Sequence, residues 1–243
     1  MFKNFFLTTL RNISRNRVYA FINVFGLSIG LASSILILLF VSSELSYDNY
    51  HSKADNIYRL YLDGVLEDRV LKGGNTSIAS GPAYKQEIPE ILEFARFKTT
   101  GQTILIYDEE KYVDDEFVYA DSSVFRIFDF HMLEGNPETA LKEPNTIVLT
   151  KSLAQKIFGN REALNKVISI NSDSSFYTVT GVIEDLPANT HFEFSALASY
   201  HSLEESNRTF WLSNNIFTYL LFDEKANPEE VQKKITEVSI KYI

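Results

Sequence analysis

The stretch VFGLSIGLASSILILLF, Val24–Phe40, is apolar enough to enter a membrane, yet it carries two glycines and several serines. It lies within a longer run, Val18–Ser43, of 26 residues without a charged side chain. As an α-helix this run extends for about 39 Å, and the hydrocarbon core of a bilayer is roughly 30 Å thick. A cleaved signal peptide is the alternative, but its apolar region has only about 7–15 residues. The run therefore predicts a transmembrane helix over residues 18–43.

Charge is distributed unevenly along the 243 residues, whose formal net charge is −9. The part up to Ser43 has no acidic side chain and four basic ones: Lys3, Arg11, Arg15 and Arg17. The rest holds 19 basic and 32 acidic residues, with Glu44 and Asp48 directly after the span. Because basic residues favour the cytoplasmic side, the N-terminus is predicted to be cytoplasmic and residues 44–243 to lie outside the cytoplasm. An acidic domain repels the phosphate backbone, so this domain is not expected to bind nucleic acid.

The segment before the span, residues 1–17, has the apolar spacing of a helix. One helical face would carry Phe2, Phe5, Phe6, Leu10 and Ile13. Most basic residues would lie elsewhere, so the segment predicts an amphipathic helix in the cytoplasmic interface, in contact with membrane lipid. A frayed basic N-terminus is the alternative.

Small residues recur inside the span at four-residue intervals: Gly26, Gly30 and Ser34. This spacing forms a groove in which a second transmembrane helix can approach closely. A simple anchor needs no such groove. We therefore predict that these three residues pack against another membrane helix.

Downstream of the span, strand and helix patterns alternate irregularly. Strand patterns occur at Ile57–Leu66, in FARFKTT, QTILIYD and KYVDDEFVYAD, on both sides of the turn Ser172–Ser175, and at Ile216–Phe222. Helices are predicted from Pro82, between the N-cap Thr150 and the C-cap Gly159, and from the cap Asn227 onward. Without a sustained series of βαβ units, the fold class is predicted to be α+β.

No stretch has the pattern of a catalytic or cofactor-binding motif. Cysteine is absent, which excludes disulfides and thiolate metal sites. There is no G-x-x-x-x-G-K-[ST] motif and no G-x-S-x-G motif, and KGGNTS (Lys72–Ser77) fits a loop tip better than a phosphate cradle. The histidines, His51, His131, His191 and His201, are too widely spaced to form a ligand pair in sequence. The acidic stretch Asp108–Glu116 fits a solvated hairpin better than a cation site. The chain is predicted not to be an enzyme and to hold no cofactor or metal.

Three stretches together carry a family resemblance: ELSYDNYHSKADNIYRLY after the span, MLEGNPETALKEPNTIVLTKSLAQKIFG, and YTVTGVIEDLPANTHFEFSAL. In this order they resemble the MacB/FtsX-like permease family of ABC transporters, in its Bacteroidetes-type form. The resemblance covers nearly all of residues 1–243. One departure is REALNKVI, where the family has a Pro-(Ile/Leu)-Gly-Lys turn. Asn165 tolerates a positive φ well, so the turn can be kept.

The resemblance implies a periplasmic core domain over residues 44–243 with two lobes, a porter-like β/α lobe and an inserted lobe near Val124–Tyr200. It implies a place in the inner membrane and further transmembrane helices after this chain. The helix pattern from Asn227 continues to Ile243 without a terminator, which independently indicates a fragment boundary there. The resemblance also implies mechanotransmission: a partner ATPase binds and hydrolyses ATP, and the movement passes through the membrane helices to the periplasmic domain. A second permease copy or homologue, forming a dimer, and a periplasmic adaptor are further implied partners.

Three functions stay open at this point. The chain could belong to a permease that exports or extracts a substrate of unknown identity. It could belong to an FtsX-like regulator that relays ATPase movement to a periplasmic cell-wall hydrolase without transport. It could also be a membrane-anchored binding module without an ATPase.

Overall fold

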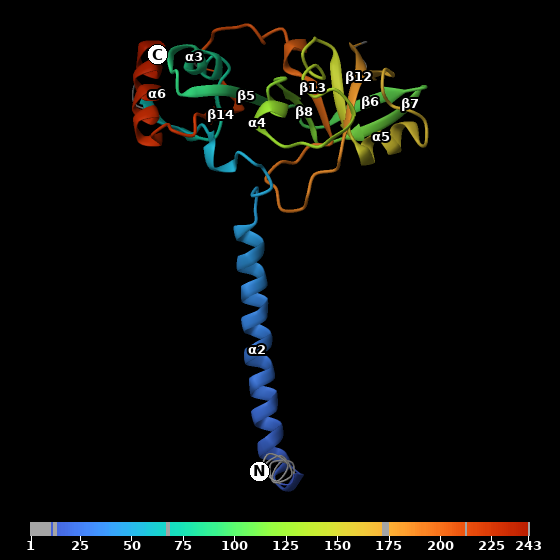
Figure 1. Ribbon diagram of the computed structural model, residues 1–243. Helices are drawn as coiled ribbons and strands as arrows, with labels where there is room; N and C mark the ends of the chain where they lie inside the picture. Colours follow the sequence, from blue (N-terminus) through green and yellow to red (C-terminus); the bar gives the residue numbers. More distant parts are fainter. Residues whose placement is uncertain (1–10, 12–13, 67–68, 172–174, 212, 243) are drawn as a thin grey trace. The chain divides into compact units, whose positions relative to one another are not determined.

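The computed structural model describes residues 11, 14–66, 69–171, 175–211 and 213–242 (Figure 1). The chain divides into two compact units, Met1–Tyr47 and Asp48–Ile243. The amphipathic helix predicted over residues 1–17 lies mainly outside the described residues, and it stays a prediction.

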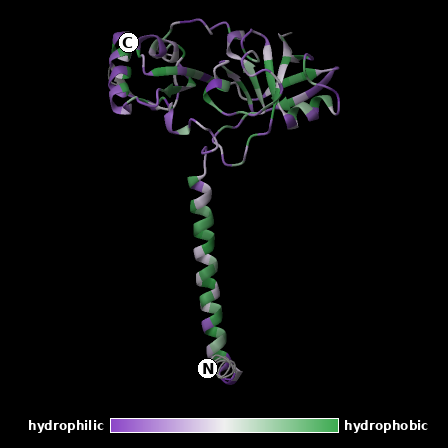
Figure 2. Cartoon of the chain, viewed as in Figure 1, coloured by the Kyte–Doolittle hydropathy of each residue, from purple (hydrophilic) through white to green (hydrophobic). Residues whose placement is uncertain are grey.

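The first unit contains one long helix, α2 (Arg17–Leu45), which includes the whole predicted span. It has no buried residue, and by length and composition it is able to cross a membrane. Figure 2 shows hydrophobic residues along most of its length. The hydroxyl of Ser28 donates to the carbonyl of Val24 at 2.7 Å. Serine hydroxyls in α2 can thus be satisfied inside the helix, as apolar surroundings require.

The second unit is built on a twelve-stranded sheet in the order β1-β14-β5-β8-β13-β10-β12-β11-β6-β7, with β4 paired to β14 and β9 to β12. The pairs β8–β13 and β10–β12 are parallel and the other pairs are antiparallel. The strands are β1 (Ile57–Arg59), β4 (Thr76–Ser77), β5 (Ile91–Thr99), β6 (Thr103–Tyr107), β7 (Glu110–Asp114), β8 (Phe117–Ala120), β9 (Met132–Gly135), β10 (Thr146–Thr150), β11 (Val167–Ile170), β12 (Ser175–Ile183), β13 (Ala196–Ser199) and β14 (Asn214–Phe222). A separate hairpin joins β2 (Leu62–Leu66) and β3 (Arg69–Gly73).

Helices cover the sheet at both ends (Figure 1). They are α3 (Ser80–Glu87), α4 (Val124–Ile127), α5 (Lys151–Phe158) and α6 (Pro228–Tyr242), with 3-10 turns η1 (Ala54–Asn56) and η2 (Tyr200–Ser202). Figure 1 shows α3 and α6 at one end and α5 near β6 and β7 at the other. A mixed sheet with few, irregularly placed helices confirms the predicted α+β class.

The two helices with predicted caps form as expected. In α5, the hydroxyl of Thr150 accepts the N–H of Leu153 at 3.4 Å, and Gly159 ends the helix with φ +64°. In α6, the side chain of Asn227 accepts the N–H of Glu229 at 3.0 Å. Each cap satisfies a backbone group that the helix itself leaves unpaired.

Successive side chains of a strand point to opposite faces of the sheet, and in β14 both faces are buried. On one face, Tyr219 packs in a core with Phe97 and Phe128. On the other, Leu220 packs with Val231 and further residues of α3 and α6. Both faces of the strand are thus covered, which explains the nearly continuous apolar pattern from Ile216 to Phe222.

A further core lies toward the other end of the sheet, where α5 packs on β10 and β12. Leu105 of β6 belongs to this core together with Leu149 and Leu153. Strand β6 also pairs with β11, so residues before Val124 share a sheet and a core with the segment Val124–Tyr200. The ladder continues without a break from β1 to β7. The bounds of the inserted lobe stay a prediction.

A buried ion pair joins Arg96 of β5 to Asp121, the residue directly after β8. Arg96 is 4% exposed and Asp121 is 6% exposed. The Nε and Nη2 atoms of Arg96 each donate to a carboxylate oxygen of Asp121 at 2.8 Å, and the Arg96 N–H donates to it at 2.9 Å. Nη1 donates to the carbonyls of Ile78 and Ser206, at 3.1 and 3.3 Å. The guanidinium lies over the ring of Tyr200, 4.0 Å from its centroid.

The turns show one correction and one confirmed prediction. The single strand predicted at Ile57–Leu66 is wrong: β1 ends at Arg59, and β2 begins at Leu62 in another sheet. The turn in REALNKVI is kept, because Asn165 takes φ +63° and its N–H donates to the carbonyl of Val179 at 2.8 Å.

Candidate functional site

The predicted helix-packing residues Gly26, Gly30 and Ser34 lie on α2, at intervals that place them near one face. A methyl group added at either glycine would meet no atom within 4 Å outside the neighbouring turns. The hydroxyl of Ser34 donates to the carbonyl of Gly30 at 2.9 Å. The stripe is open among the described residues, and its packing against a second helix stays a prediction.

A polar cluster begins at Asp48, the first residue of the second unit. One carboxylate oxygen of Asp48 accepts the hydroxyl of Thr190 at 2.8 Å and the N–H of His191 at 3.0 Å. The other lies 2.7 Å from Nδ1 of His191. The Asp48 N–H also donates to the carbonyl of Asn189 at 2.9 Å. The chain that enters the domain is therefore held by the loop at residues 189–191.

The backbone and charge of Asp48 suit this position. Its φ is +58°, in the left-handed region that aspartate adopts more readily than most residues. Burial would raise the pKa of its carboxyl, but hydrogen bonds from His191 and Thr190 outweigh burial and hold the pKa below its ordinary value. The carboxylate therefore stays ionised at neutral pH and accepts all three of these hydrogen bonds.

Tyr219 extends the cluster from Asp48 and His191 into the core. Its hydroxyl lies 2.6 Å from Nε2 of His191, and the residue is 5% exposed. Because Nδ1 of His191 faces an ionised carboxylate, Nδ1 carries the proton and Nε2 accepts the hydroxyl of Tyr219 in the neutral ring. Burial raises the pKa of Tyr219 to about 12, against an opposing effect of Arg59. A buried hydroxyl that resists ionisation is a poor nucleophile, so this Tyr–His–Asp chain fits a structural role.

His51 forms a second polar contact nearby. It is 5% exposed, and its Nδ1 accepts the N–H of Asp129 at 3.1 Å. The carboxylate of Asp129 in turn accepts the N–H of Ser52. Burial, opposed by nearby carboxylates, holds the pKa of His51 below its ordinary value. The ring packs edge-on against Phe128 and Phe192, so it is a neutral member of the aromatic core.

A cavity of about 300 Å³ lies between these groups. Its walls include Asp48, His51, His191 and Tyr219, together with Arg59. Apolar walls come from Ala54, Ile57 and Phe128. The cavity thus combines a mostly apolar surface with a few convergent polar groups, which is the usual composition of a ligand pocket.

The other candidate positions have ordinary partners. The stretch Asp108–Glu116 contains the turn and the second strand of the β6–β7 hairpin, in agreement with the predicted hairpin, and Asp108 and Glu109 have positive φ in the turn. Asp108 pairs with Arg161 at 3.2 Å, and Asp114 accepts the hydroxyl of Ser195 at 2.6 Å. Across the described parts of the chain, no group of three or more His, Asp or Glu side chains could hold a metal ion.

Sequence reasoning did not identify the cluster of Asp48, His191 and Tyr219, or the place of His51 beside the same cavity. Each residue is unremarkable in sequence, and the members are far apart along the chain. One signal was available: His51 and His191 both lie in stretches that carry the family resemblance. Two such stretches that meet in the fold are candidates for one site.

Comparison with known proteins supports the resemblance. The model of the MacB-like periplasmic core domain family matches residues 20–238. No curated protein matches the chain. A solved domain assigned to a permease from Porphyromonas gingivalis, of the Bacteroidetes, has a TM-score of 0.71 at 21% identity, covering 79% of this chain and 84% of that one.

Two other solved structures share the fold. The periplasmic region of MacB from Actinobacillus actinomycetemcomitans has a TM-score of 0.56 at 15% identity, covering 75% of this chain and 82% of that one. The extracellular domain of the noncanonic ABC-type transporter YknZ from Gram-positive bacteria has a TM-score of 0.53 at 11% identity, covering 76% and 94%. At such identities the likeness concerns the fold, whereas the family match extends over most of the sequence. This chain belongs to the family of MacB-like periplasmic core domains, found in permeases of the MacB/FtsX-like type.

Proposed function

We propose that this chain is the N-terminal part of an ABC transporter permease subunit that passes movement between α2 and its periplasmic domain. In this proposal a partner ATPase binds and hydrolyses ATP, and the domain movement serves export or extraction of a substrate whose identity is open. The observation that carries the proposal is the anchoring of Asp48 to residues 189–191, directly after the helix.

The junction after α2 suits the transmission of force. Only Ser46 and Tyr47 separate the last residue of α2 from Asp48. A flexible linker of many residues would absorb a displacement of the helix, because its end-to-end distance fluctuates widely. Here the entering chain is instead fixed through the ionised Asp48 carboxylate. Charge-assisted hydrogen bonds of this kind are stronger than neutral ones.

The proposal includes an orientation. Four basic residues, Lys3, Arg11, Arg15 and Arg17, precede the uncharged span. We therefore expect the N-terminus in the cytoplasm, α2 in the inner membrane and residues 44–243 in the periplasm. The Gly26–Gly30–Ser34 stripe would then pack on another transmembrane helix of the full permease or of a second permease copy. A periplasmic adaptor is a further proposed partner.

Spin labels can test the proposal directly, because the chain has no cysteine of its own. The full-length gene product is purified from its native membranes with any ATPase that remains bound. A cysteine at Lys225, an exposed position, carries the label in a permease dimer, and the distance between labels is measured with and without ATP and vanadate. Nucleotide trapping should shift this distance in the wild type.

Matched variants separate coupling from catalysis by the ATPase. Asp48→Asn should reduce the distance shift while ATP hydrolysis continues, and Asp55→Asn, at an exposed neighbouring aspartate in η1, should leave it unchanged. Absence of a bound ATPase would refute the permease proposal and leave an anchored binding module. Movement without passage of any substrate, in a complex that activates a cell-wall hydrolase, would favour the FtsX-like regulator.

A further inference from the structure

Arg59 is held in place by its neighbours in the sheet. Strand β1 pairs with β14 so that Arg59 lies directly opposite Tyr219. The guanidinium lies over the ring of Phe217, 4.5 Å from its centroid, and 6.0 Å from the centroid of Tyr219. Opposite and diagonal cross-strand neighbours share one face of a sheet, which explains this arrangement. A side-chain hydrogen bond also joins the guanidinium to Tyr219. Because a guanidinium has five N–H donors, others at its edge can still bind an anion.

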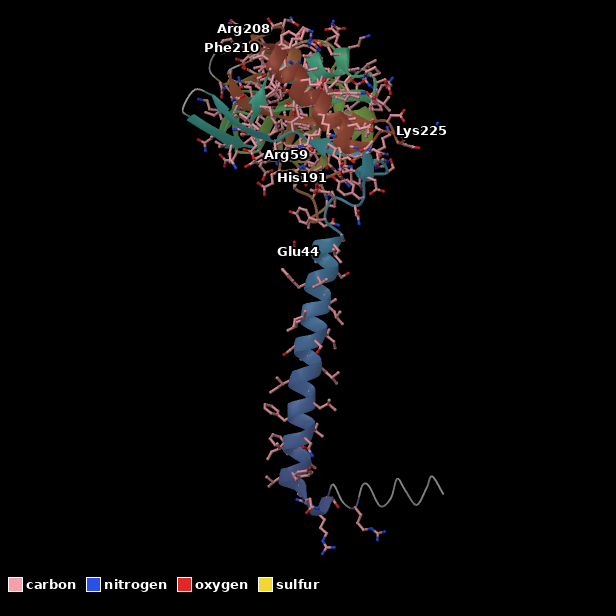
Figure 3. All side chains as sticks on the ribbon, turned by 90° about the vertical axis from the view of Figure 1, so that its left-hand side faces the viewer. Glu44, Arg59, His191, Arg208, Phe210 and Lys225 are labelled. Carbon is pink, nitrogen blue, oxygen red and sulfur yellow. The ribbon has the colours of Figure 1, made fainter. Side chains whose placement is uncertain are left out.

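Arg59 forms no ion pair with an acidic side chain among the residues that the structure describes. The residue is exposed. Other arginines of the domain, such as Arg96 and Arg126, do pair with carboxylates. Figure 3 shows Arg59 and His191 on the same side of the domain, and both line the 300 Å³ cavity.

The rest of the cavity determines what kind of anion would fit. Ile57, Phe128 and Ala54 offer apolar surface beside the guanidinium. The one carboxylate in the wall, Asp48, is turned to the donors of Thr190 and His191. A volume of about 300 Å³ is at the lower end of the range for ligand pockets, so the site suits a small group and not a whole lipid.

We infer that this cavity binds a small anionic group carried on a short apolar body, of the phosphate-ester class. The anion would lie against the edge of the Arg59 guanidinium, and the apolar part against Ile57 and Phe128. Arginine forms two parallel hydrogen bonds with phosphate or carboxylate oxygens, which favours such a group over a neutral one.

Two sources could supply this chemistry. Asp48, in the wall of the cavity, follows α2 by only three positions in the chain, so the headgroup of an anionic membrane lipid is one source. A free phosphate ester in the periplasm is the other. This inference does not depend on a partner ATPase, and its test is independent of transport.

The test uses the full-length protein in phosphatidylcholine nanodiscs. Glycerol 3-phosphate is titrated by calorimetry as the free source. Nanodiscs that also contain phosphatidylglycerol supply the lipid source, and hydrogen–deuterium exchange of residues 48–60 reports its binding. We expect saturable binding of at least one of these probes.

Three variants determine whether Arg59 and the cavity are responsible. Arg59→Gln should weaken binding at least tenfold, because it removes the charge and the paired donors. Arg208→Gln makes the same change at an exposed arginine far from Arg59 in Figure 3, and it should bind like the wild type. Ala54→Leu fills the cavity without changing charge and should also weaken binding.

The outcomes separate the sources and can overturn the inference. Binding of glycerol 3-phosphate that is lost in Arg59→Gln supports a free phosphate ester as the ligand. Protection by phosphatidylglycerol alone, lost in the same variant, supports a lipid headgroup. If neither probe acts on the folded wild-type protein, or if Arg59→Gln and Arg208→Gln bind equally, the inference is wrong.

Discussion

Replacing Arg96 by methionine should destabilise the periplasmic domain by about 3–5 kcal/mol. The change leaves the Asp121 carboxylate buried, with the N–H of residue 96 as its one remaining donor among the contacts described above. It also removes the N–H group that donates hydrogen bonds to the buried carbonyls of Ile78 and Ser206. A domain has a total stability of about 5–15 kcal/mol, so this one substitution should remove a large part of it.

The assay is urea unfolding of residues 48–243, followed by the fluorescence of Trp211. This is the only tryptophan of the chain, and it stacks on Tyr242 with ring centroids 5.0 Å apart. Arg161→Met is the matched control, because its pair with Asp108 is exposed and should contribute only about 0–1 kcal/mol.

A double variant examines the cause of this loss. Arg96→Met with Asp121→Leu removes both charges, and replacement of a buried pair by apolar side chains is often neutral or stabilising. We therefore expect it to recover much of the stability lost in Arg96→Met alone. If the single variant at Arg96 loses no more than the control at Arg161, the reasoning about the stranded carboxylate is refuted.

Three further predictions concern the turns, acid stability and the membrane helix. Gly135→Ala should lower the stability measured by urea unfolding more than Gly159→Ala. Both glycines have positive φ, but a Cβ at Gly135 would lie 2.3 Å from a backbone oxygen of β12, whereas a Cβ at Gly159 would meet no atom within 4 Å. Burial lowers the pKa of His51 in the folded protein, so the buried neutral ring contributes its full stability above a pH of about 6.5 and loses it as the pH falls. The His51→Phe variant should therefore show a smaller decrease of Tm with falling pH than the wild type. An equal decrease in both proteins would contradict this prediction. Gly30→Leu should reduce co-purification with a second permease copy, whereas Ala32→Leu, on another face of α2, should not; equal effects would exclude the stripe as the contact.

Local signals predicted part of this fold well. The caps Thr150 and Asn227, and the turn residue Asn165, act within a few residues of chain, so sequence alone is enough to recognise them. The division between β1 and β2 could not be recognised in this way. Alternation from Ile57 to Leu66 indicates extended chain, but it does not identify the partner, and β1 is defined by pairing with β14 far along the sequence.

The candidate site was harder to predict for the same reason. Asp48, His191 and Tyr219 are joined by contacts between segments that only the folded sheet brings together. The types of these residues do not identify a site, because aspartate, histidine and tyrosine are common in loops and strands. The family resemblance indicated which stretches matter, and the geometry shows which side chains of those stretches meet.

Strand β14 links the entry of the domain to its last helix. Tyr219 holds the entering chain on one face of the strand, through His191 and Asp48. On the opposite face, Leu220 packs in one core with Val231 of α6. Side chains that are adjacent in one strand cannot move independently, because packed interiors transmit displacement with little compression. A displacement imposed at Asp48 should therefore reach α6 through β14.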